Sequence, residues 1–253
     1  MNKFFSLLLI PLCLSFTEGN VHAAKKLQLR GIKGEDNREF PDVTKTPWRS
    51  IGRINKDGSF CTGVLIGPDT VLTAAHCFWN KRTRRWSDAK YFHFLPGYEK
   101  GRFAGHAKGV SYSLSTDMKK AGSYPNAERK DDWAILKIDK PLGDQFGWIP
   151  VLSTSLKKRN ASVMQSGYSK DYPHVLTMHR NCKVVRIAKL NDGTVPLYAH
   201  DCDATKGDSG SPIFTKTDGE YQIIGLHSAT RTLDDGKVYG IGIPSSLFSN
   251  IRR

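Results

Sequence analysis

Residues 207–212 read Gly207-Asp208-Ser209-Gly210-Ser211-Pro212, which places a serine between two glycines on a predicted tight turn. A second motif, Thr73-Ala74-Ala75-His76-Cys77, places a histidine beside a cysteine at the end of an apolar run. Asp132 lies between the two motifs and opens another apolar run. The three polar residues therefore occur in the order His, Asp, Ser. This combination predicts a serine nucleophile that is activated by an imidazole and a carboxylate.

The chemistry assigns a role to each residue of these motifs. We expect Ser209 to be the nucleophile and His76 to act first as general base and then as general acid, because imidazole titrates near neutral pH. The backbone N–H groups of Gly207 and Ser209 are expected to form an oxyanion hole. Asp132 and its neighbour Asp131 are both candidates for the orienting carboxylate, although strand alternation turns only one of them inward.

These motifs resemble those of the chymotrypsin-fold serine proteases, most closely the bacterial branch that includes the glutamyl endopeptidases. The resemblance extends from Ile32 to about Pro244. Four further stretches carry it: Ile32-Lys33-Gly34-Glu35-Asp36-Asn37-Arg38, Pro47-Trp48-Arg49-Ser50-Ile51-Gly52-Arg53-Ile54, His200-Asp201-Cys202-Asp203 and Ile224-Gly225-Leu226-His227-Ser228. It implies an endopeptidase that hydrolyses protein or peptide substrates through an acyl-enzyme on Ser209, with no cofactor and no catalytic metal.

The family pattern also orders the carboxylate candidates. An aspartate, any residue, an alanine and then apolar residues select Asp132 over Asp131, so the implied triad is His76, Asp132 and Ser209. Ser228 resembles the serine that supports the buried carboxylate.

Short β-rich runs broken by turns predict an all-β fold. The expected strands are residues 59–66, 71–75, 133–138, 162–168, 176–187, 212–215, 221–228 and 238–243, followed by a short C-terminal helix at 245–251. This pattern fits a sandwich or a barrel, and the resemblance implies two six-stranded antiparallel β-barrels packed together with the active site in the cleft between them. The N-terminal barrel is expected over residues 32–146, with His76 and Asp132, and the C-terminal barrel over 147–253, with Ser209.

The chain opens with features of a secretory signal peptide. Lys3 precedes a short apolar stretch that contains Pro11, and small residues suit cleavage after Ala23. A membrane anchor is the alternative, but a spanning helix needs about 20 apolar residues. We therefore expect residues 1–23 to be removed, residues 24–31 to form a propeptide or arm, and the mature chain to be extracellular or periplasmic.

Four cysteines remain once Cys13 leaves with the signal peptide. An even number of cysteines in an exported chain indicates disulfides. Spacing together with the family resemblance favours the pairs Cys61–Cys77 and Cys182–Cys202. Zinc is the alternative, but the chain lacks the paired C-x-x-C spacing of zinc sites.

The formal net charge of +14 limits the partners that the surface can attract. The basic clusters are Lys81-Arg82-Thr83-Arg84-Arg85, Lys157-Lys158-Arg159 and Arg252-Arg253. Such a surface either attracts nucleic acid, acidic glycans or lipid head groups, or simply keeps a monomeric protein soluble. Because the clusters are scattered, the second interpretation is favoured.

Substrate specificity is the least determined property. By resemblance, Asp203 occupies the base of the primary pocket, where an aspartate selects Arg or Lys before the scissile bond. His227 occupies the place of a histidine that helps glutamyl endopeptidases to bind an acidic side chain, but Ala204 replaces their threonine, and Thr230 narrows the pocket. We expect a basic preference, with an acidic preference as the alternative.

The resemblance also raises the question of activation. In relatives that are made as zymogens, the acid before the serine pairs with a new N-terminal amine. Here Asp208 would pair with Ile32 after cleavage behind Gly31, whereas a constitutively formed site needs no such cleavage.

Two rival functions remain for comparison. A catalytically silent binding protein on a protease scaffold would use its basic surface, but such proteins usually lose a triad residue. An α/β-hydrolase esterase would show the order Ser, Asp, His and a parallel sheet with helices, and neither is present in the sequence pattern.

Overall fold

The computed structural model describes residues 29–189, 196–233 and 235–250. The predicted signal peptide and most of the predicted arm lie outside these residues. Within the described part, the chain is mostly β and forms two closed six-stranded antiparallel barrels with little helix, which confirms the predicted fold class. Among the described residues, no helix is both long and apolar enough to cross a membrane.

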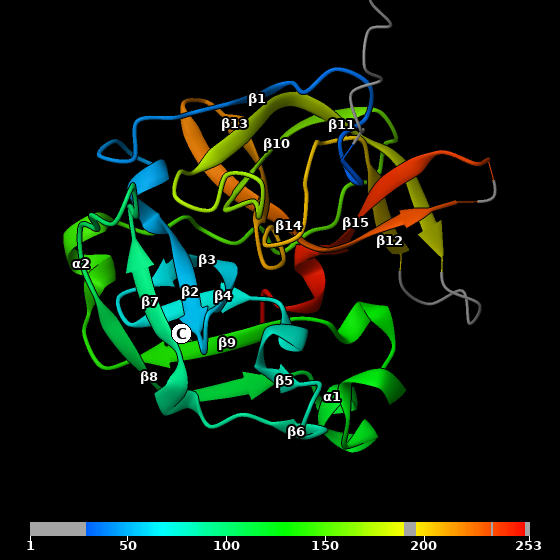
Figure 1. The fold of residues 1–253 in the computed structure, drawn as a ribbon. Helices are drawn as coiled ribbons and strands as arrows, with labels where there is room; N and C mark the ends of the chain where they lie inside the picture. Colours follow the sequence, from blue (N-terminus) through cyan, green and yellow to red (C-terminus); the bar gives the residue numbers. More distant parts are fainter. Residues whose placement is uncertain (1–28, 190–195, 234, 251–253) are drawn as a thin grey trace, which may run out of the picture.

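The first barrel closes in the order β2-β3-β4-β9-β8-β7 (Figure 1). Its strands are β2 (Ile51–Lys56), β3 (Ser59–Gly67), β4 (Thr70–Thr73), β7 (His93–Pro96), β8 (Ala107–Leu114) and β9 (Ala134–Ile138). A two-stranded hairpin, β5 (Trp79–Asn80) and β6 (Arg85–Trp86), leaves the barrel shortly after β4. The barrel thus presents the segment that contains His76 and the segment that contains Asp132 at the ends of the paired strands β4 and β9.

The second barrel follows the order β11-β10-β13-β14-β15-β12, and pairing of β12 with β11 closes it. Its strands are β10 (Ala161–Gly167), β11 (Thr177–Lys189), β12 (Pro196–His200), β13 (Pro212–Thr217), β14 (Glu220–Thr232) and β15 (Val238–Pro244). The short strand β1 (Arg38–Glu39) pairs with β11, so the segment that opens the predicted N-terminal domain lies on the C-terminal barrel. Figure 1 shows β1 crossing above β11 and β10.

Strand alternation builds a shared core that joins the barrels. In β3, Val64 and Ile66 belong to an apolar cluster that extends into both barrels, whereas Leu65 points into the first barrel. In β13, Phe214 belongs to the shared cluster and Ile213 to the interior of the second barrel. Because successive side chains on a strand face opposite sides, each of these strands fills two cores at once. The shared core fixes the position of one barrel against the other and hence the position of the segments that contain His76 and Ser209.

Several elements lie outside the predicted set. Strand β8 shows no clean alternation because its register shifts between Gly109 and Ser111, and strands β7 and β12 are short. The helices α1 (Thr116–Ala121) and α2 (Leu142–Phe146) were not predicted either. Helix α1 nevertheless carries cap signals in the sequence, since Ser115 Oγ accepts from Met118 N and Gly122 adopts a left-handed conformation. In the described part before residue 132, the chain also forms five 3-10 turns: η1 (Trp48–Ser50), η2 (Ala75–Phe78), η3 (Ala89–Tyr91), η4 (Tyr124–Asn126) and η5 (Arg129–Asp131). A further 3-10 turn, η6 (Ser245–Leu247), lies in the region of the expected C-terminal helix.

Candidate active site

The segment that carries Ser209 is held against the first barrel. Ser209 O accepts a 2.9 Å hydrogen bond from Thr62 N in β3. Gly210 has a φ of +86°, and a Cβ at this position would lie 2.3 Å from both Thr62 O and Thr73 Oγ1. Only glycine fits this conformation at such a close approach. The second glycine of the motif therefore lets the serine turn reach across from the second barrel to β3 and β4.

The backbone N–H groups of Gly207 and Ser209 are available as hydrogen-bond donors. Gly207 adopts a φ of +101°, and its carbonyl accepts from Thr62 Oγ1 at 3.1 Å. Within the described part of the chain, neither Gly207 N nor Ser209 N donates a hydrogen bond. The N–H groups of Gly207 and Ser209 are therefore available to donate to a developing oxyanion.

His76 and Asp132 meet at the end of the first barrel. His76 Nδ1 lies 2.8 Å from Asp132 Oδ2 and 3.1 Å from Oδ1, and His76 N donates to Oδ1 at 2.8 Å. The Asp132 side chain is fully buried, whereas that of His76 is 22% exposed. Burial by itself would raise the pKa of Asp132, but the charge of His76 and hydrogen bonds from His76 and Ser228 outweigh it and lower this pKa. Asp132 is thus held ionised and orients the imidazole.

The neighbouring carboxylate has a different environment. Asp131 ends the turn η5, is also buried, and interacts with Ser115 rather than with an imidazole. Burial raises the pKa of Asp131. The structure therefore brings Asp132, and not Asp131, to His76.

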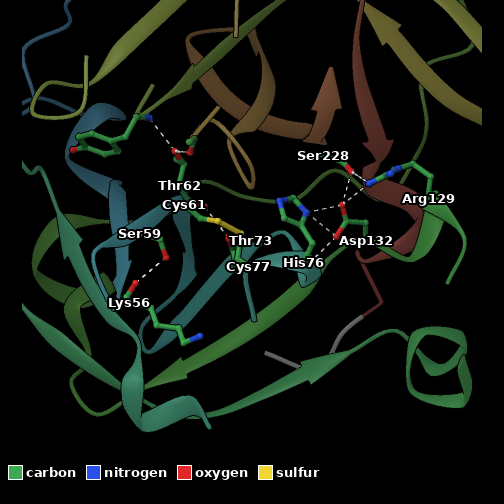
Figure 2. Close-up of a disulfide and its surroundings, with 12 residues drawn as sticks. Lys56, Ser59, Cys61, Thr62, Thr73, His76, Cys77, Arg129, Asp132 and Ser228 are labelled. Atoms are coloured by element: carbon green, nitrogen blue, oxygen red, sulfur yellow. Dashed lines mark hydrogen bonds and ion pairs between the residues drawn. A yellow bond between two sulfur atoms is a disulfide. The ribbon is translucent and has the colours of Figure 1, made fainter. Parts of the chain in front are cut away.

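Ser228 completes the surroundings of Asp132. Its hydroxyl donates to Asp132 Oδ2 from strand β14 of the second barrel, as expected from the sequence (Figure 2). Between the described residues, no hydrogen bond joins Ser209 to His76. Catalytic hydrogen bonds of this kind are often long in a free enzyme and tighten when substrate binds.

Both expected disulfides are present. Cys61–Cys77 ties β3 to the residue that follows His76, and Figure 2 shows it directly beside the imidazole. Cys182–Cys202 ties β11 to the segment that precedes Ser209. The two disulfides join cysteines that are 16 and 20 residues apart. In the chain-entropy model, a cross-link that closes a loop of this length stabilises a fold by about 3 kcal/mol. Each disulfide holds one of the segments that carry the catalytic candidates.

Arg129 is the residue near the triad that the sequence reasoning missed. Its Nη1 lies 3.2 Å from Asp132 Oδ2 and 3.3 Å from Ser228 Oγ, and it also donates to Tyr124 Oη. The Tyr124 ring packs at 5.5 Å from the His76 ring. Arg129 and Asp132 are three residues apart across the turn η5, and this spacing was the only signal that the sequence contained.

Asp203 is engaged by the N-terminal segment. Its Oδ1 accepts from Lys33 N at 2.8 Å and its Oδ2 from Asn37 N at 3.1 Å. His179 Nδ1 lies 3.4 Å from Oδ2, and the Asp203 side chain is 1% exposed. The carboxylate that was expected at the base of the primary pocket thus has its hydrogen bonds within the protein. Lys33 contributes again, because its Nζ donates to the carbonyls of Gly31 and Cys202.

Two buried histidines lie close to the serine segment. His227 N donates to Ser211 O, and His227 O accepts from Gly210 N, both at 2.8 Å. His227 Nδ1 lies 3.0 Å from His200 Nε2, which belongs to β12 of the same barrel. Within the described part of the chain, His227 Nε2 has no hydrogen-bond partner. Burial, and then the positive charge of Lys33, lower the pKa of His227 to about 3, so its ring is neutral near pH 7.

The other residues that were predicted for the pocket and for activation are buried or half-buried. Ala204 is fully buried and donates its N–H to Gly31 O at 3.1 Å, and Thr230 lies half-buried on β14 opposite Gly240. Asp208 is buried and accepts from four groups: Ser169 Oγ at 2.6 Å, Thr205 N at 2.8 Å, Gln165 Nε2 at 3.2 Å and Ser211 Oγ at 3.5 Å. In this uncleaved chain Ile32 N donates to Leu29 O.

Comparison with known proteins agrees with this geometry. The family model described as Trypsin matches residues 38–251. The chain belongs to the trypsin family. It is a trypsin-like serine endopeptidase, and its substrates are proteins or peptides.

Individual relatives are distant. The glutamyl endopeptidase of Bacillus licheniformis is 25% identical over 239 residues, which cover 88% of this chain and 68% of that protein. Serine protease 23 of Mus musculus is 28% identical over 197 residues, or 69% of this chain, and the chain spans only 49% of that protein's length. Among solved structures, a Glu endopeptidase in complex with MPD superposes with a TM-score of 0.70 at 24% identity, covering 86% of this chain and 95% of that one. Protease Anisep from Arthrobacter nicotinovorans gives a TM-score of 0.61 at 20% identity, with 82% and 93% covered. These structures show the same fold.

Proposed function

We propose that this trypsin-family endopeptidase is exported and cleaves after acidic residues, through an acyl-enzyme on Ser209. In this mechanism His76 takes the proton of the Ser209 hydroxyl as it attacks the substrate carbonyl. Asp132 orients the imidazole and stabilises its charged form. The N–H groups of Gly207 and Ser209 stabilise the oxyanion, and His76 then returns the proton to the leaving amine. Export is supported by the two disulfides, which are typical of oxidising compartments.

The pair of buried histidines carries the proposal of acidic specificity. If His200 donates its Nε2 proton to His227 Nδ1, then His227 carries its own proton on Nε2 and can donate it to a substrate carboxylate. His200 Nδ1 is buried without a partner in the described part of the chain, so a proton on Nδ1 would have no acceptor. The proton of the neutral ring is therefore better placed on Nε2, which faces His227 Nδ1. A carboxylate that enters beside His227 also favours the protonated imidazole, which strengthens the interaction.

The position of Asp203 weakens the basic preference that was expected from the sequence. A pocket that selects Arg or Lys needs a carboxylate free to meet the substrate cation. Asp203 instead accepts hydrogen bonds from Lys33 N and Asn37 N, and its own backbone N–H donates to His179 Nδ1 at 2.8 Å. The name of the Bacillus licheniformis relative also supports the acidic alternative.

A peptide library with every residue in turn before the scissile bond tests the specificity. We expect Glu or Asp to be cleaved best, His227→Ala to lose this preference, and Asp203→Ser to retain it. Titration of active Ser209 with a fluorophosphonate normalises each variant to its folded, competent fraction. Cleavage after Arg or Lys that disappears in Asp203→Ser would support the basic reading instead.

We also propose that Asp208 receives the amine of Ile32 after cleavage behind Gly31. Gly31 packs directly on the segment before Asp208, since a Cβ at Gly31 would lie 2.0 Å from Ala204 O. Thr205, the next residue, donates to Asp208. N-terminal sequencing of the active protein tests this proposal, because a mature chain that begins before Ile32 would support a constitutively formed site.

A further inference from the structure

A cavity of about 510 Å³ lies beside the catalytic histidine. Its walls come from the β5–β6 hairpin and from the segment around η4, and the lining residues are Trp79, Lys81, Arg84, Ser123, Tyr124, Pro125 and Asn126. Tyr124 connects the cavity to the active site, because its ring packs on that of His76. Trp79 follows η2, the turn that contains His76, without an intervening residue. None of the roles described above uses this cavity.

The hairpin is anchored in place. Trp86 Nε1 donates to Gly122 O at the end of α1 at 3.2 Å, and the rings of Trp79 and Trp86 pack edge to face at 5.0 Å. Asn80 Oδ1 accepts from Arg82 N and Thr83 N, which shapes the turn between the two strands. The two walls of the cavity are therefore linked to each other before any ligand arrives.

The cations of the hairpin have no acidic partners. Lys81, Arg82, Arg84 and Arg85 are exposed, and none of them forms an ion pair within the described part of the chain. Lys81 and Arg84 line the cavity. Arg231, on β14 of the second barrel, lies close enough to interact electrostatically with Tyr124 and is also unpaired there. Two exposed cations without ion-pair partners in the described part of the chain thus line a cavity that also has Trp79 and Tyr124 in its wall.

We propose that this cavity, the hairpin pocket, binds an acidic side chain of the peptide substrate near the scissile bond. Lys81 and Arg84 meet the carboxylate, while Trp79 and Pro125 contact its methylene groups. An extended peptide advances about 3.3–3.6 Å per residue, so a side chain within about three residues of the scissile bond can reach past Tyr124. The proposal rests on the endopeptidase activity but does not depend on which residue occupies the primary pocket.

The test compares matched peptides that share the residue preferred before the scissile bond. One member carries Glu, and the other Gln, at each of the three positions on either side. We expect kcat/KM to be about 3- to 20-fold higher for Glu at one or two of these positions, mainly through KM, as expected for two exposed charge pairs. The ratio should fall as salt increases, because exposed charges are screened.

Two double variants locate the effect. Lys81→Gln with Arg84→Gln should bring the Glu-to-Gln ratio close to one, whereas Lys158→Gln with Arg159→Gln, which removes two exposed cations outside the cavity, should leave it unchanged. Fluorophosphonate titration and melting temperature establish that each variant is folded. A ratio near one in the native protein, or one that survives in the Lys81/Arg84 variant, overturns the proposal. Loss of heparin binding in that variant with an unchanged peptide ratio would instead assign the hairpin to a sulfated glycan.

Discussion

His200 Nε2 lies 3.0 Å from His227 Nδ1, so two buried imidazoles share a hydrogen bond between β12 and β14, and β15 lies between these strands in the sheet. Burial, and then the charge of the neighbouring His227, lower the pKa of His200 well below its usual value. Both rings are therefore neutral near pH 7. The pair adds two buried, titratable rings to the second barrel, and it links the proposed specificity of the enzyme to its stability in acid.

Stability should fall as the pH drops from about 6.5 toward 3. The pKa of His227 is lower in the folded chain, about 3, than in the unfolded chain, about 6.5, so the unfolded state takes up the proton first. At pH 5, His227 alone should reduce the free energy of unfolding by about 2 kcal/mol relative to neutral pH. Urea unfolding at pH 7 and pH 5 measures this loss. It should be smaller by a similar amount in His227→Gln, and an equal loss in both proteins would contradict the assignment.

Replacement of the proposed nucleophile or base should remove peptidase activity. We expect Ser209→Ala and His76→Ala each to lower kcat on the order of 10⁶-fold, because the two residues act as one unit. Melting temperatures should change little, since both side chains are partly exposed. Fluorophosphonate labelling should fail in Ser209→Ala. Activity that survives this substitution would place the nucleophile elsewhere.

The two adjacent aspartates should differ sharply. Asp132→Asn should reduce kcat by about 10⁴-fold, because an amide at this position supports the wrong tautomer of His76. Asp131→Asn is the matched control, and it should leave turnover close to that of the native protein since Asp131 interacts with Ser115 instead. The opposite result would reverse the assignment of the carboxylate.

Arg129 should influence turnover by holding Asp132 in place. Its Nη1 lies 3.2 Å from Asp132 Oδ2 and 3.3 Å from Ser228 Oγ. In Arg129→Gln, kcat should therefore fall on the order of 10-fold, because the buried carboxylate loses a hydrogen bond from a charged donor. Lys130→Gln provides a neighbouring control, because Lys130 pairs with Glu128 at 3.1 Å. An unchanged kcat in Arg129→Gln would mean that the arginine acts only by packing.

The sequence by itself determined the fold class and the main candidates of the active site. Gly210 shows why: its φ of +86° favours glycine, so the turn that carries Ser209 leaves a local mark in the motif. The apolar runs that became β3, β9, β13 and β14 were visible for a similar reason, since each buries side chains in one or two cores. Elements with less burial or broken alternation, such as β8, could not be recognised from the chain alone.

Tertiary structure decided how residues far apart in the chain interact. Asp203 has the sequence position of a pocket carboxylate, but only the docking of the N-terminal segment shows that Lys33 N and Asn37 N occupy its oxygens. The contact between His200 and His227 likewise depends on where β12 and β14 lie in a closed barrel. A hydrogen bond needs its two groups within about 3 Å, and motif spacing does not carry that information. The chemistry of the serine was therefore readable from the sequence, whereas the environment of its substrate pocket was set by packing between the barrels and the N-terminal segment.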